Sequence, residues 1–147
     1  PIVDESMQTG LPGVFACGNT VHVHDLVDFV TLESQKAGRA AAAYAAEATA
    51  SSPSAPLEIC AGAGVTYTVP QRVFPAKLEK TTEVFFRVNG LYDHADIVVL
   101  DGGRELFRRK REHLAPGEME RLTVPAAKIQ SAAGPLTVAL DTGGEHR

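Results

Sequence analysis

The hydrophobic pattern of this chain changes its period at a short stretch of small residues and prolines, and that change divides the chain in two. Before the stretch, residues 25–48 place apolar side chains near helical spacing and run into the alanine-rich segment 40–46. After it, polar residues alternate with Val84, Phe86 and Val88, which is the period of a β-strand. The stretch itself, residues 49–56, is typical of a linker. We therefore expect an α+β chain in which a helical part precedes a β part.

The β part, residues 57–141, is predicted to contain about six or seven short strands separated by turns. The hairpin signal Asp101-Gly-Gly103 separates a continuous apolar run from a charged segment that begins at Arg104. The number and spacing of the strands favour an immunoglobulin-like β-sandwich, although the chain lacks a Cys–Trp–Cys core. The strands are expected at 65–69, 83–88, 97–100, 104–111, 120–124 and 136–140, and residues 142–147 are expected to form a tail.

The N-terminal part contains a run typical of a turn, a strand and a corner before a helix: Thr9-Gly-Leu-Pro-Gly-Val-Phe-Ala-Cys-Gly-Asn19. The apolar residues 14–16 are predicted to form a short strand buried in a sheet. Gly18 would let a ligand approach the backbone, and Asn19 offers one acceptor and two donors. Asp25 is expected to cap the following helix, with Asp28 as an acid in its first turn. The unpaired N–H groups at such a helix start favour an anionic ligand, for example a reduced flavin.

This run resembles the second flavin-binding motif of the FAD- and NAD(P)-dependent pyridine nucleotide-disulfide oxidoreductase superfamily, in which the last residue is usually aspartate. The segment His22-Val-His-Asp-Leu-Val-Asp28 is similar to one found in branches grouped with amine, opine and glycerol-phosphate dehydrogenase-like flavoproteins. Parts of the β domain, residues 64–71 and 116–120, are similar to the C-terminal extension of those branches. The resemblance implies FAD as the cofactor and is compatible with NAD(P) as an electron partner. It also implies a set of cofactor-binding residues: Gly18, Asn19, His24, Asp25, Leu26 and Val27.

In this interpretation residues 1–48 are the C-terminal edge of an FAD-binding domain, a strand-plus-helix remnant that precedes the sandwich. Asn19 would contact the ribityl chain, and the segment from Val21 to Val30 would lie near the isoalloxazine ring. The chain has no glycine-rich dinucleotide-binding turn, so the isolated chain is predicted neither to retain FAD nor to transfer hydride. Because the first methionine is Met7, we expect the chain to be part of a longer flavin-dependent oxidoreductase. The sequence identifies no catalytic residue.

The expected partners are the remainder of that longer polypeptide, a redox subunit, or a second copy that covers residues 1–48. An alternative stays open, in which the sandwich is a non-catalytic interaction module that docks a partner subunit. The net charge of −4 shows no nucleic-acid footprint, and no apolar run approaches the length that spans a bilayer. Two unpaired cysteines, Cys17 and Cys60, point to a reducing, cytoplasmic compartment.

Two charged groups of residues allow more than one interpretation. His22 and His24 alternate as on an extended segment, so they could be a metal pair, proton donors beside a flavin, or ordinary loop histidines. No third ligand lies close to them in the sequence, so no metal site is expected. The basic segment 108–111 could dock an acidic partner, but neighbouring acids favour a solvated strand end of mixed charge.

Overall fold

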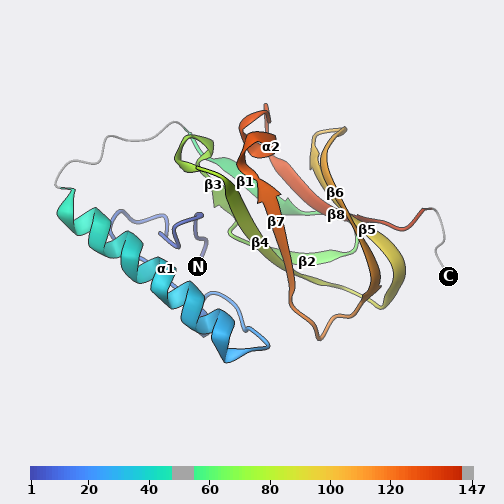
Figure 1. Cartoon of the computed structure of the whole chain (residues 1–147), viewed down its shortest axis with the longest axis horizontal. Coiled ribbons are helices and arrows are strands. Elements are labelled where there is room, and N and C mark those ends of the chain that lie inside the picture. The colour runs from blue at the N-terminus through green and yellow to red at the C-terminus, as the bar shows by residue number, and fades with distance from the viewer. Residues whose placement is uncertain (48–54, 144–147) are drawn as a thin grey trace.

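The computed structural model describes residues 1–47 and 55–143. These residues form a mixed α+β fold with two sheets and one long helix (Figure 1). Most of the linker predicted at 49–56 and of the tail predicted at 142–147 lies outside the described residues. No helix in the described part of the chain is long and apolar enough to cross a membrane.

The β part forms two sheets of unequal size. Its strands are β1 Leu57–Ala61, β2 Val65–Val69, β3 Arg72–Val73, β4 Thr81–Val88, β5 Tyr92–Asp101, β6 Arg104–Leu114, β7 Glu120–Pro125 and β8 Leu136–Asp141. A 3-10 helix, η2 (Pro75–Lys77), follows β3, and a short helix, α2 (Ala126–Gln130), follows β7. One sheet has the order β3-β1-β8-β5-β6 and the other β2-β4-β7. The first and last strands, β1 and β8, pair in parallel, whereas β5 pairs antiparallel with both of its neighbours.

The two sheets share one hydrophobic core. In β4 every second side chain is buried, and Phe86 at its centre is fully shielded from solvent. Ile97 and Val99 of β5 and Val138 of β8 meet the same core from the other sheet. All six predicted strand segments fall within observed strands, and the Asp101–Gly103 turn joins β5 to β6 as expected. The pattern did not predict β1, β3 or α2.

Residues 1–26 differ from the predicted strand and corner. Residues 14–16 belong to no sheet: Phe15 forms only an isolated bridge with Gln8, and Val14 is exposed. The predicted buried strand is therefore wrong. A strand needs a neighbour for its backbone groups, and no other described strand lies beside this segment. The corner itself is present as a 3-10 helix, η1 (Gly18–Thr20).

The long helix α1 spans Val27–Ala46, within the predicted range 25–48. Its N-cap is Leu26, which makes no side-chain cap bond, so the assignment of Asp25 as the cap is wrong. The acid in the first turn is Asp28, as predicted. Only Glu33 and Ala37 of the helix are buried, and Ala37 joins a small second core with Val3, Met7 and Val69.

Backbone contacts hold the first residues of the chain against the β part. The backbone N–H of Val3 donates to the side-chain oxygen of Gln71 at 2.9 Å, and the N–H of Phe74 donates to Glu5 at 2.9 Å. The segment therefore lies between α1 and the end of β2, as Figure 1 shows. One side of the N-terminal part is thus fixed to the sheets through contacts that the sequence pattern did not reveal.

Candidate functional site

Hydrogen bonds fix the backbone of the Gly-Asn corner, whereas Asn19 at the same corner is exposed. Gly18 is buried at φ 64°, a left-handed conformation that favours glycine, and its N–H donates to Glu33 Oε1 at 2.7 Å. The carbonyl of Gly18 accepts from the N–H groups of Val21 and His22 at 2.9 and 3.1 Å. Asn19, the next residue, is exposed. The amide side chain is therefore available to a ligand at a corner whose backbone is held in place.

Behind the corner, two imidazoles share one carboxylate oxygen. His22 Nε2 lies 2.7 Å and His24 Nε2 lies 2.8 Å from Glu33 Oε2. The three side chains are 2%, 0% and 4% exposed, respectively, and the two rings stand 4.1 Å apart between centroids. We call these three residues the His–Glu–His cluster. Imidazole nitrogen and carboxylate oxygen are ligands that transition metals bind, so the cluster could hold an ion as well as hydrogen bonds.

The hydrogen bonds around Glu33 favour its ionised form. Burial by itself would raise the pKa of the Glu33 carboxyl, but the hydrogen bonds from His22, His24 and the Gly18 N–H hold that pKa below its ordinary value. For both Nε2 atoms to donate to Oε2, each imidazole must carry a proton on Nε2. The Nδ1 atoms of both histidines are buried and have no hydrogen-bond partner within residues 1–47 and 55–143.

Aromatic rings close the cluster off from solvent. The Phe85 ring lies 5.7 Å from the His22 ring and 5.2 Å from the His24 ring, both edge-on. Phe29 of α1 lies 6.0 Å from His24, and Tyr67 of β2 lies 6.3 Å from His22. The cluster therefore sits in the contact between the N-terminal part and the sheet that contains β2 and β4.

Asp25 ties the same segment to the β part. Its carboxylate pairs with Arg87 of β4 and accepts from the backbone N–H of Met119. Arg87 also donates to the carbonyl of Val23 at 2.9 Å. Desolvation opposes ionisation of Asp25, but the bonds from Met119 and Arg87 outweigh it, so the pKa of Asp25 is lowered. The residue expected to cap the helix is thus an anchor between the corner segment and β4.

The apolar neighbours of the histidines face the other way. Val23 is 59% exposed, Leu26 57% and Val27 76%. Because His22, Val23 and His24 alternate on an extended segment, the imidazoles turn inward while the valine turns outward. Among the predicted cofactor-binding residues, Asn19, Leu26 and Val27 are accessible, whereas Gly18 and His24 are buried and Asp25 is engaged with Arg87.

Sequence reasoning missed Glu33, Arg87 and Phe85 as members of this site. A signal for Glu33 does exist, because it lies four residues after Phe29 and four before Ala37 on one face of α1. An acid inside a stripe of otherwise apolar positions must find donors when it is buried. No comparable signal marks the two β4 residues, since they lie 52 or more residues from Glu33 in the chain.

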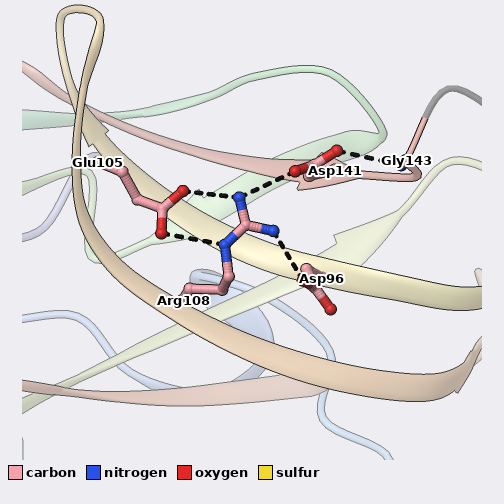
Figure 2. Close-up of polar contacts among 5 residues, drawn as sticks. All are labelled: Asp96, Glu105, Arg108, Asp141 and Gly143. Atoms are coloured by element: carbon pink, nitrogen blue, oxygen red, sulfur yellow. Dashed lines mark hydrogen bonds and ion pairs between the residues drawn. The ribbon is translucent and has the colours of Figure 1, made fainter.

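The basic segment of β6 forms a surface of mixed charge, as predicted. Arg108 pairs with Asp96 at 2.6 Å, with Glu105 at 2.6 Å and with Asp141 at 2.8 Å (Figure 2). The three carboxylates raise the pKa of the Arg108 guanidinium. The charge of Arg108 is therefore already paired within the chain.

Comparisons of this chain with protein-family models, curated proteins and solved structures find no match.

Proposed function

We propose that residues 1–47 complete the FAD site of a longer flavin-dependent oxidoreductase and that the two-sheet part is its appended domain. The observation that carries the proposal is the position of exposed apolar side chains next to the corner. Of the nine large hydrophobic side chains exposed in the described part of the chain, eight lie within residues 2–44 and only Leu91 lies elsewhere. Such a concentration of apolar surface is typical of a face that something else covers.

The arrangement suits a flavin in three respects. Asn19 is accessible and can accept from or donate to a ribityl hydroxyl. Val23, Leu26 and Val27 offer an apolar surface for an aromatic ring system. The start of α1, where Leu26 provides no side-chain cap, adds a partial positive charge that favours a reduced, anionic flavin. The protein would then position the ring and tune its electrostatics, while the cofactor performs the redox chemistry.

The proposal is tested on the native protein that carries this sequence. Its intact mass and its flavin content are measured first, and Asn19→Ala is then compared with Asn89→Ala, a matched change at the only other asparagine in the chain. We expect a mass well above 15.6 kDa, stoichiometric flavin, and reduced flavin occupancy in Asn19→Ala alone. A flavin-free native protein, or equal occupancy in both variants, would contradict the proposal.

A second candidate is a non-catalytic module that docks a partner subunit. It is favoured by the contacts of residues 1–47 with their own β part: the Asp25–Arg87 pair, the Phe29–Phe85 packing at 6.2 Å and the Val3–Gln71 bond. A self-contained module would show such packing. The two candidates differ in what covers the exposed apolar side chains of residues 2–44: a flavin in the first and a partner subunit in the second. The flavin content of the native protein therefore distinguishes them.

For the appended domain we propose an immunoglobulin-like sandwich. The support is its span of residues 57–141, its two sheets around one core and the short turns between β4, β5 and β6. An experimental structure that superposes on that architecture would support the assignment, and a different strand connectivity around the core would exclude it.

A further inference from the structure

We propose that the His–Glu–His cluster is a structural binding site for a divalent transition-metal ion of the zinc class, held by His22 Nε2, His24 Nε2 and Glu33 Oε2. This inference goes beyond the proposed flavin site and does not depend on it. The cluster faces away from the exposed surface at Val23, Leu26 and Val27, so a flavin and a metal ion would occupy different sides of the same segment.

The three ligand atoms already converge. Both Nε2 atoms lie within 2.8 Å of one carboxylate oxygen, and the three ligand atoms lie within 4.8 Å of one another. Ligands about 2.1 Å from an ion in the tetrahedral geometry of zinc lie about 3.4 Å apart. Binding therefore requires each nitrogen, now 2.7 or 2.8 Å from Oε2, to withdraw from it by about 0.6–0.7 Å.

The charge of the cluster also favours a cation. The Glu33 carboxyl group is buried, its partners are the two imidazoles and the Gly18 N–H, and no Lys or Arg of the described residues forms an ion pair with it. Buried charges in proteins are normally paired or bound to metal ions. A divalent cation would supply a positive charge next to this carboxyl group.

The imidazoles can present their Nε2 lone pairs by a change of tautomer. Ion binding requires the proton of each ring to leave Nε2, and it can reside on Nδ1 instead. Neither Nδ1 atom has a hydrogen-bond partner among the described residues, so the change breaks no bond at Nδ1, but it leaves each Nδ1–H without an acceptor, a cost that the bonds to the ion must offset. The type of ligand also narrows the choice of ion. Imidazole nitrogen binds zinc, iron, cobalt, nickel and copper ions better than magnesium or calcium ions.

The surroundings orient the ligands and shield them from solvent. The N–H of Gly18 fixes the second oxygen of Glu33 at 2.7 Å, which orients the carboxylate in the way that outer-shell groups orient metal ligands. The rings of Phe29, Tyr67 and Phe85 exclude solvent around the histidines. An ion bound here would connect the corner, α1 and the extended segment between them.

The test uses the whole 147-residue chain, freed of metal with a chelator, and Zn²⁺ and Co²⁺ as probes. We expect one equivalent to bind, visible absorption bands from bound Co²⁺ that Zn²⁺ displaces, and a higher Tm with Zn²⁺ because the ion binds only the folded state. His22→Ala and His24→Ala should each weaken Zn²⁺ binding by at least about a hundredfold, more than the loss caused by changing an outer-shell group. His113→Ala is the matched control, since that histidine is exposed and pairs with Asp93.

Two results would overturn the proposal: no stoichiometric binding by the wild-type chain, or binding that persists in the cluster variants and disappears in His113→Ala. If a cluster variant does not fold, the wild-type chain still decides, because Zn²⁺ must alter the ¹⁵N signals of the His22 and His24 rings rather than those of the other histidines. The flavin content of the native protein is measured separately, so the failure of one proposal leaves the other standing.

Discussion

Glu33 connects the corner, the two histidines and α1 through a single carboxylate. Its two oxygens accept from three donors: the Gly18 N–H, His22 and His24. In Glu33→Gln the amide group would place its own N–H donors against the imidazole N–H groups. Leaving such buried groups unsatisfied costs about 1–3 kcal/mol. We therefore expect urea unfolding of the metal-free chain to show Glu33→Gln less stable by that amount.

The control is Glu83→Gln. Glu83 forms a partly exposed pair with Arg121 at 3.4 Å, and such pairs contribute at most about 1 kcal/mol. Equal losses in the two variants would show that the carboxylate of Glu33 has no special role in the fold.

Two buried acids should give opposite pH dependences of stability. The pKa of Glu33 is lowered from its ordinary 4.5, so its stabilisation is complete above about pH 4.5 and is lost as pH falls through the lower folded-state pKa. Burial raises the pKa of Glu5, although the Phe74 N–H opposes the shift, so its ionisation destabilises the fold as pH rises above about 4.5. Relative to wild type, Glu33→Gln should therefore lose stability as pH rises toward about 4.5, while Glu5→Gln should gain stability as pH rises above about 4.5. Denaturant titrations across that range check both signs, and parallel curves would refute them.

The sequence indicates that His22 and His24 are candidate site residues, but it does not indicate that Glu33 is their partner. The two histidines alternate along the chain, so both point inward once one side of that segment is buried. Glu33 lies eleven residues from His22, on a different element, so no local spacing brings them together. Asp25 is a similar case. Its local sequence predicts a helix cap, but its carboxylate forms an ion pair with Arg87, which is distant in the chain.

The helix α1 depends on a narrow contact. Ala37 is buried with Val3, Met7 and Val69, whereas much of the helix faces solvent. A larger side chain at this position must displace its neighbours, and overpacking costs about 1–3 kcal/mol. We expect Ala37→Leu to lower the free energy of unfolding by that amount, measured by thermal or urea unfolding. Ala42→Leu, on the exposed face of the same helix, should change it by less than about 0.5 kcal/mol.

The apolar pattern of the sequence predicts some strands correctly and one wrongly. The period of two identified strand segments in the β part because each lies with one face on the shared core. The segment 14–16 has the same apolar character, yet no described strand offers it a ladder. Local pattern therefore predicts which segments can be strands, while the presence of a partner decides which of them are.

For the molecule as a whole, the exposed face and the missing glycine-rich turn lead to one expectation. The isolated 147-residue chain should not retain FAD, because Asn19 and a few apolar contacts leave the pyrophosphate unbound. Gel filtration of the chain with excess FAD, followed by absorbance at the flavin band, checks this. Co-elution of one equivalent of FAD with the isolated chain would contradict it.

The same face should promote self-association of the isolated chain. Leu26 and Val27 are among the most exposed apolar residues beside the corner, so Leu26→Asp/Val27→Glu should reduce association without loss of stability, since neither side chain is buried. Sedimentation velocity of the variant and of wild type checks the expectation. A matched pair of changes at the exposed polar residues Ser34 and Gln35 should leave association unaltered.

The parallel pairing of β1 with β8 has a mechanical consequence. Ile59, Cys60 and Ala61 lie beside Leu136, Thr137 and Val138, and the two strands run in the same direction. Tension applied to the start of β1 and the end of β8 would pull the strands past each other lengthwise. The ladder bonds would then carry the load together instead of opening one at a time. A pulling force that enters the β part through its two ends therefore meets its resistance at the junction of the first and last strands.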